Sequence, residues 1–233
     1  MKMASRLVWV KGDIKIIKHP KSNGATKSAI AVKAAGYPSI RAAYRRVIDE
    51  KLIDFGTSEK GTRVTAYQNA IRTAMVEAFN AAFDAGYAES SGAPRADADD
   101  EDAMYWIMER VNEEYGYIGT MMQSLKQLRD QVWAKEAKVG DVNDFVKARN
   151  DGYSSSLDTV NATGKLYGKK RMMLTMVGED GAESCTDCVK RKGKRYSARK
   201  WLAIGFPPSR DFECHGYNCA HFLQDDQGNQ VTP

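Results

Sequence analysis

The chain has few of the residues that most enzymes use for catalysis. It contains only three histidines and four cysteines in 233 residues, and two of the histidines, His215 and His221, lie among the cysteines. His19 is the only histidine outside that cluster, so histidine-based acid–base or triad chemistry has few candidates. The phosphate-binding, dinucleotide-binding, nucleophile-elbow and His-Glu-x-x-His motifs are also missing. We therefore expect a protein that is not an enzyme.

Long apolar runs are missing as well. No window approaches the roughly 18–20 uncharged apolar residues that a membrane-spanning helix requires. The first residues lack the apolar core of a signal peptide, because only Leu7–Val10 is continuous there. These absences predict a soluble protein without a membrane partner that matures in a reducing cytoplasm. In such a compartment, binding of a metal by thiolates is favoured over disulfides.

All four cysteines fall in two closely spaced pairs in the last fifth of the chain. Cys185 and Cys188 have Cys-x2-Cys spacing, and Cys214 and Cys219 follow after a basic, aromatic-rich segment. Two intervening residues let the backbone reverse so that both sulfurs face one metal, and the second pair supplies the other corners of a tetrahedron. We predict one structural zinc per chain with these four ligands. Two disulfides or four separate thiols are the alternatives, and neither explains the paired spacing.

Two histidines flank the second cysteine pair and leave the ligand set open. Either His215 or His221 could replace a cysteine as a ligand, hydrogen-bond to a ligand, or have a purely structural role. Four bound ligands would close the coordination sphere and leave no position for a substrate. Metal binding should be coupled to folding, because Glu179–Pro233 contains few large apolar side chains.

The net charge of +5 conceals a strong segregation of charge along the chain. Residues 1–51 contain twelve Lys or Arg against three acidic residues, and Glu89–Glu114 contains nine acidic residues against two basic ones. The segment Lys165–Lys200 contains eleven basic residues against four acidic ones. Two basic ends therefore flank an acidic middle.

The basic segments near the C-terminus are dense enough to bind a phosphate backbone. They are Lys169–Arg171 and Lys190–Arg195, and Tyr196 and Trp201 follow the second segment as candidate stacking groups. An acidic protein partner or a solvated face are the alternatives. The predicted contact residues for nucleic acid or an acidic partner are Lys190, Arg191, Lys192, Lys194, Arg195, Arg199 and Lys200.

The middle of the chain has helical periodicity. Apolar residues recur at spacings of three and four, which predicts one buried helix face rather than a cofactor site; they are Val64, Tyr67, Ile71, Met75, Phe79 and Phe83. Ser39 and Thr62 are predicted N-caps of helices that end near Gly56 and Gly86. The acidic run Asp97–Asp102 suits the start of the next helix better than a metal site.

That next helix should run to Trp133, with an irregularity at Gly116–Gly119. A further helix should start at Asp141, and another helical stretch should lie near Leu157. Near the N-terminus, Leu7–Val10 and Ile14–Ile17 flank Lys11-Gly12-Asp13, which predicts a short hairpin.

The expected fold class is therefore mainly α, with three parts. A basic N-terminal arm with a hairpin or extended structure (1–38) should be ordered only by contact with a partner. A helical body of four or five helices (39–168) and a small, treble-clef-like zinc-knuckle module (169–233) should follow.

The last third of the chain also shows a recognisable order of motifs. The segments are Tyr153–Asp158, Asn161–Gly168, Glu183–Cys188, Gly193–Ala198, Trp201, Gly205–Pro208 and Cys214–Cys219. This order resembles the C-terminal module of minor head, or head morphogenesis, proteins of tailed bacteriophages, the group that includes the Mu protein F-like family. That family commonly closes with Cys-x-Cys, whereas this chain has the wider Cys214-x4-Cys219.

The resemblance implies a non-enzymatic structural component of a phage virion, of the minor head, cement or neck/connector type. It would be assembled in the host cytoplasm in multiple copies, dock through its basic arm and zinc module, and contact capsid, portal or neck proteins and packaged DNA. The residues alone leave an alternative, a soluble zinc-module nucleic-acid-binding protein with Lys190–Lys200 as its contact surface. Salt-dependent DNA binding would favour this alternative, and co-sedimentation with particles would favour the virion protein.

Overall fold

The computed structural model describes residues 4–10, 13–19, 36–95, 100–179, 184–207, 212–213 and 219–232. The chain divides into two compact units, Met1–Ala35 and Gly36–Pro233. The first unit contains the predicted hairpin, in which β1 (Ala4–Val10) pairs antiparallel with β2 (Asp13–His19). The basic arm that follows the hairpin lies outside the described residues.

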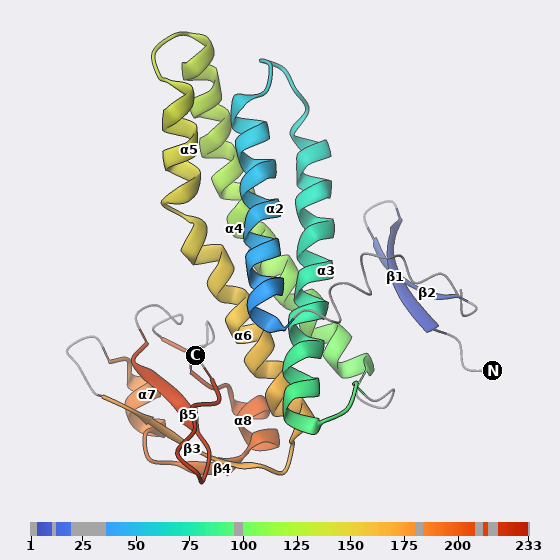
Figure 1. Ribbon diagram of the computed structural model, residues 1–233, viewed down its shortest axis with the longest axis vertical. Coiled ribbons are helices and arrows are strands. Elements are labelled where there is room, and N and C mark those ends of the chain that lie inside the picture. The colour runs from blue at the N-terminus through green and yellow to red at the C-terminus, as the bar shows by residue number, and fades with distance from the viewer. Residues whose placement is uncertain are drawn as a thin grey trace. The chain divides into compact units, whose positions relative to one another are not determined.

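The second unit starts with a bundle of five helices, so the mainly helical fold is confirmed (Figure 1). They are α2 (Tyr37–Thr57), α3 (Val64–Ser91), α4 (Asp100–Trp133), α5 (Val139–Lys147) and α6 (Asn150–Gly168). In the part of the chain that the structure describes, no helix has the length and apolar character needed to cross a membrane.

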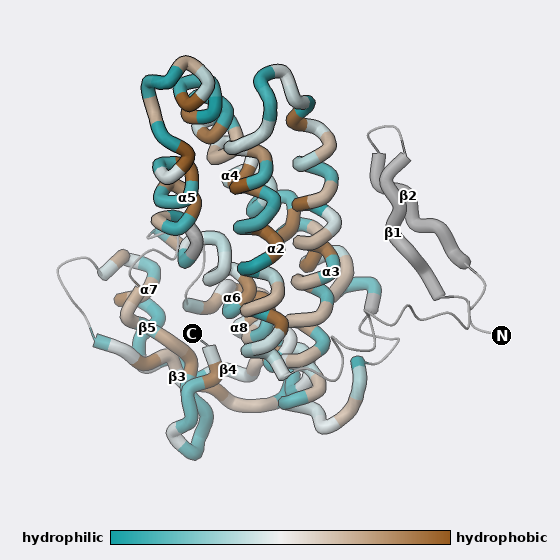
Figure 2. The backbone as a smooth tube through the Cα atoms, turned by 45° about the horizontal axis from the view of Figure 1, so that its top comes forward, coloured by the Kyte–Doolittle hydropathy of each residue, from teal (hydrophilic) through white to brown (hydrophobic). Residues whose placement is uncertain are grey.

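One hydrophobic core fills the space between these helices. The predicted stripe of α3 is confirmed as part of it, because Ile71, Met75, Phe79 and Phe83 have no exposed surface. Brown, hydrophobic residues recur along α2, α3 and α4 between teal, hydrophilic ones (Figure 2). Burying each such side chain contributes roughly 1.5–3 kcal/mol. The main partners of the stripe are Ile48, Leu52, Phe55, Ile107, Val111, Leu125, Leu157 and Val160.

Glycines allow the backbones of α3 and α6 to approach closely. A Cβ atom on Gly86 would lie 2.0 Å from the carbonyl oxygen of Asn161, and one on Gly164 would lie 2.1 Å from that of Phe83. The side-chain amide of Asn161 donates to the carbonyl of Ala82 at 3.0 Å across the same contact. Only glycine permits this spacing, so these positions fix how α6 packs on α3.

Polar side chains link α2 to α6 along another face. The Tyr37 hydroxyl donates to Asp158, whose carboxylate also pairs with Arg41 at 3.3 Å. Tyr153 on α6 donates in the same way to Asp49 on α2. Burial, and then the hydrogen bond to the carboxylate, raises the pKa of both tyrosines, so the phenols remain protonated donors.

One predicted helix end is confirmed and the other is wrong: α2 ends at Thr57, one residue after Gly56, but α3 does not end near Gly86. Gly86 lies inside α3, which continues to Ser91 and ends at Gly92 with a left-handed φ of 73°. Gly56 lies inside α2, where a Cβ would meet Cγ1 of Val142 at 2.5 Å. Both glycines permit close packing of a neighbouring helix, and Gly86 does so five residues before its own helix ends.

The predicted caps and the predicted irregularity are also wrong. The backbone N–H of Ser39 donates to the carbonyl of Gly36 at 2.9 Å, because α2 already starts at Tyr37. Arg63, not Thr62, precedes α3. Helix α4 runs without a break through Gly116–Gly119, because neighbouring Ile118 and Met122 are buried in the core and offset the roughly 1 kcal/mol cost of each glycine.

Candidate metal centre

The C-terminal part of the second unit is a small antiparallel sheet with two short helices (Figure 1). The central strand β3 (Met173–Gly178) pairs with β4 (Arg195–Ser197) on one side and with β5 (His221–Gln224) on the other. The helices are α7 (Thr186–Arg191) and α8 (Ala198–Ile204). We call residues 169–232 of this part the C-terminal module.

The module has its own hydrophobic core around Trp201. This side chain is fully buried, and its indole N–H donates to the carbonyl of Leu174 at 3.0 Å. Leu166 of α6 and Met176 of β3 belong to the same core. The expectation that Glu179–Pro233 is poor in large apolar side chains did not count Leu166 and Met176, because both precede Glu179 in the sequence.

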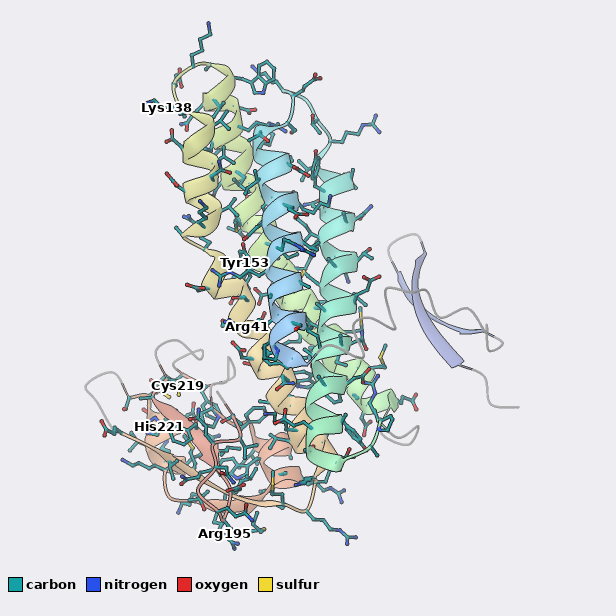
Figure 3. The ribbon with its side chains drawn as sticks, in the orientation of Figure 1. Arg41, Lys138, Tyr153, Arg195, Cys219 and His221 are labelled. Carbon is teal, nitrogen blue, oxygen red and sulfur yellow. The ribbon has the colours of Figure 1, made fainter. Side chains whose placement is uncertain are left out.

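Three potential metal ligands converge at the edge of this core. Cys188 lies on α7, Cys219 lies two residues before β5, and His221 begins β5, where Figure 3 shows Cys219 and His221 beside each other. Their ligand atoms all lie within 4.8 Å of one another. The two sulfur atoms are 3.6 Å apart, close to the value of about 3.8 Å expected for two thiolates at 2.3 Å from one tetrahedral zinc. This group could hold a metal ion, and its ligand types suit zinc.

The other predicted ligands are not part of this three-residue group. Cys185 is buried at the start of α7, where its sulfur accepts a hydrogen bond from the backbone N–H of Cys188 at 3.4 Å. It lies beside the three-residue group but outside it. Cys214 and His215 lie outside the described residues, so the zinc knuckle itself stays a prediction. The structure brings His221 to Cys188 and Cys219.

The protonation of Cys188 reflects its surroundings. Burial raises the pKa of the Cys188 thiol, and the neighbouring thiols of Cys185 and Cys219 raise it further. None of these three cysteines is in a disulfide. A bound divalent cation would reverse the electrostatic preference and favour the thiolate.

Gly178 positions His221, a role that the sequence analysis missed. The two residues are paired across β3 and β5. Gly178 has a φ of 142°, and a Cβ there would lie 2.4 Å from the carbonyl oxygen of Ala220 and 2.7 Å from the Cα of His221. The absence of a side chain at this position lets β5 bring His221 to the metal group.

Reciprocal hydrogen bonds hold the segment that leads toward Cys214. The N–H of Thr186 donates to Glu213 at 2.9 Å, and the N–H of Glu213 donates to Asp187 at 3.0 Å. The hydrogen bond from Arg191 lowers the pKa of Asp187, and the hydrogen bond from Thr186 lowers that of Glu213. Residues 212–213 are therefore tied to the start of α7.

The structure separates the predicted contact residues into two groups. Arg191 pairs with Asp187 at 2.6 Å and lies over the ring of Phe212 at 4.5 Å. Arg195 makes two hydrogen bonds to Asp226, at 3.1 and 2.7 Å. Both are thus held by contacts within the module, whereas the side chains of the remaining five are exposed: Lys190, Lys192, Lys194, Arg199 and Lys200.

The predicted stacking groups are also engaged internally. Trp201 is buried, and its ring packs against that of Tyr196 at a centroid distance of 5.2 Å. Trp201 therefore cannot stack on a base, contrary to the prediction.

A comparison of the chain with models of protein families, with curated proteins and with solved structures found no match.

Proposed function

We propose that this chain is a structural, non-catalytic protein whose C-terminal module is held together by one zinc ion. The observation that supports this most directly is the convergence of Cys188, Cys219 and His221, with their ligand atoms within 4.8 Å of one another. The ligands come from α7 and from the residues at the start of β5, so a bound ion would cross-link segments about thirty residues apart. Structural zinc sites stabilise small modules in this way.

We further propose that Cys185 completes a four-ligand site. It occupies the other end of the Cys-x2-Cys turn, its sulfur already faces the N–H of Cys188, and it is buried. His221 then takes the place predicted for Cys214. Four protein ligands leave no open position for a substrate, which favours a structural role over a catalytic one.

One pocket of the described helical body offers little for acid–base catalysis. A pocket between α3 and α4 is lined by Val64, Gln68, Gly116, Gly119, Thr120, Met122, Gln123 and Lys126. Lys126 is the only ionisable residue of this lining, and it forms an ion pair with Asp130 at 3.6 Å. An acid–base pair with matched pKa values, which most enzymatic reactions require, is missing from this pocket.

The ligand set can be tested by zinc analysis of the full-length protein purified under reducing conditions. We expect about one zinc per chain in the wild type and in Cys214→Ser, and loss of zinc in Cys188→Ser and His221→Ala. Cobalt substitution provides a second readout, because a site of three cysteines and one histidine and a site of four cysteines give different visible spectra. Zinc retained in His221→Ala but lost in Cys214→Ser would restore the four-cysteine site and exclude His221 as a ligand.

We propose a tailed-phage virion as the setting of this structural protein. The support is the order of motifs from Tyr153 to Cys219, which resembles the C-terminal module of phage minor head proteins. Purified particles should then contain the chain, and Cys188→Ser should reduce its incorporation while the helical body remains folded. Absence of the protein from washed particles would contradict this setting without affecting the zinc site.

A soluble nucleic-acid-binding protein is the second candidate. The exposed basic residues of the module support it, because clustered lysine and arginine side chains suit contacts with a phosphate backbone. Binding of nucleic acid by a chain that is absent from particles would support this candidate.

A further inference from the structure

Folding brings two separate basic segments of the sequence together in the module. The N–H of Ala198 donates to the carbonyl of Met172 at 2.7 Å, and that of Arg199 donates to the carbonyl of Lys170 at 2.9 Å. The pairing of Met173 with Ser197 continues this contact into the sheet. The start of α8 is thus fastened to the turn between α6 and β3, and Lys169–Arg171 lies next to Arg199 and Lys200.

We call these five residues the basic face: Lys169, Lys170, Arg171, Arg199 and Lys200. The side chains of Arg171, Arg199 and Lys200 are exposed and form no ion pair with any residue that the structure describes. Hydrogen bonds from Asn229, and to a smaller extent the charge of Lys169, lower the pKa of Asp225, and Lys170 lies over the ring of Tyr167 at 5.2 Å. At Arg171, Arg199 and Lys200 the face therefore carries positive charge that no ion pair with a described residue neutralises.

The basic face differs from the densest basic run of the sequence, Lys190–Arg195. Two of the six residues in that run, Arg191 and Arg195, are in ion pairs with Asp187 and Asp226. An external anion would have to compete with these carboxylates. It meets no such competition at Arg171, Arg199 and Lys200.

The chemistry of the basic face indicates the kind of partner. The centres of protein–protein interfaces are rich in aromatic residues and poor in lysine, and sites for single-stranded nucleic acid use exposed aromatic rings. The face consists of lysine and arginine, and its neighbouring aromatic rings are engaged within the protein: Trp201 is buried against Tyr196, and the ring of Tyr167 is in contact with Lys170. Among the described residues, the large hydrophobic side chains that are exposed belong to other surfaces: Tyr105, Tyr117, Trp133, Val139 and Val189.

We propose that the basic face binds the phosphate backbone of double-stranded nucleic acid without reading its sequence. Clustered cations with no stacking group fit a contact made through phosphates, in which affinity comes from release of counterions. This proposal depends neither on the virion setting nor on the identity of the metal ligands.

The test is the salt dependence of binding to a short DNA duplex, measured by fluorescence anisotropy with the zinc-loaded full-length protein. In the variant Arg171→Gln/Arg199→Gln/Lys200→Gln, the slope of log affinity against log salt should fall by about 0.9 for each lost contact. For three contacts this corresponds to an affinity loss on the order of 10²-fold at 0.1 M salt. Circular dichroism checks that the variant is folded.

A charge-matched control removes three exposed lysines from the other end of the bundle, in Lys60→Gln/Lys135→Gln/Lys138→Gln. Figure 3 shows Lys138 at the end of the helices opposite to the module that contains Arg195. This control should keep nearly the wild-type slope. The variant Arg171→Lys/Arg199→Lys should also keep it, because it preserves the charge. If the triple variant fails to fold, single substitutions should each lower the slope by about 0.9.

Three results would overturn the proposal. The first is no binding of the wild type to duplex at low salt, which would leave an acidic protein as the partner. The second is an equal loss of affinity in the control and in the triple variant, which would show a general charge effect. The third is tighter binding to a single strand than to the duplex.

Discussion

Replacing Gly178 with alanine should weaken zinc binding, although Gly178 provides no ligand atom. The added Cβ would lie 2.4 Å from the carbonyl oxygen of Ala220, and real Cβ contacts are essentially never under 3.0 Å. Strand β5 would therefore have to move by at least about 0.6 Å next to His221, whereas metal–ligand distances tolerate only about 0.2 Å. The φ of 142° at Gly178 adds backbone strain for any other residue.

We expect the zinc affinity of Gly178→Ala to fall by about 10- to 100-fold, the usual effect of changing a residue that orients a metal ligand. This is a loss of about 1.4–2.7 kcal/mol in binding free energy. Competition with a chromophoric chelator measures it directly. Gly193→Ala is the matched control, because Gly193 also lies in the module with a positive φ of 74° but has no atom within 4 Å of the added Cβ.

The two variants together separate steric displacement from general strain. If Gly178→Ala keeps wild-type affinity, β5 does not need Gly178 to present His221. If both variants lose the same affinity, backbone strain explains the loss and the close contact with Ala220 does not.

Three further predictions concern stability. Chelation of the metal should unfold mainly the residues after about Glu179 and leave the helical body intact, which hydrogen exchange would show as protection lost in the module alone; simultaneous loss throughout the chain would contradict this. Denaturant titration should show that Gly164→Ala lowers the free energy of unfolding by about 1–3 kcal/mol, because its Cβ would lie 2.1 Å from the carbonyl of Phe83. The control is Gly116→Ala, whose Cβ meets no atom within 4 Å. In the same titration it should be neutral or stabilise α4 by up to about 1 kcal/mol. The pKa of Asp187 is lower in the folded state, so its contribution to stability is present above its unfolded pKa of about 3.9 and is lost as the pH falls through the folded value. The difference in melting temperature between wild type and Asp187→Asn should therefore shrink as the pH is lowered from 7 toward 2. A difference that grows would show that Asp187 does not stabilise the folded state in this way.

The helical body could largely be predicted from the sequence, because periodicity is a local signal. The stripe from Val64 to Phe83 follows the repeat of a buried helix face, and its central residues are fully buried. The roles of Gly56 and Gly86 could not be predicted in the same way. A glycine that ends a helix and one that admits a neighbouring backbone look alike until the neighbour is known.

The candidate metal site could be predicted only in part. Cysteine spacing identified Cys188 and Cys219, but the approach of His221 to them depends on the pairing of β5 with β3. One local signal did exist, because residues two apart in extended chain point to the same side, and Cys219 and His221 have this spacing.

The charged surface of the module shows the same limit. The ion pair between Asp187 and Arg191 has the i,i+4 spacing of a helix, so the sequence contained the signal for it. The partner of Arg195 is Asp226, which lies thirty-one residues further along the chain. No local pattern predicts such a pair, and it can be seen only when the fold is known.

Helix α6 belongs to both cores, since Leu157 and Val160 lie in the core of the bundle and Leu166 lies in the core of the module. The module is therefore anchored to the bundle through the last turns of α6. Torque or tension applied to the module would pass along α6 into the glycine-mediated contact with α3. In a row of aligned copies, every module would keep the same polarity relative to its bundle, so any charge on the modules would add up along the row instead of averaging out.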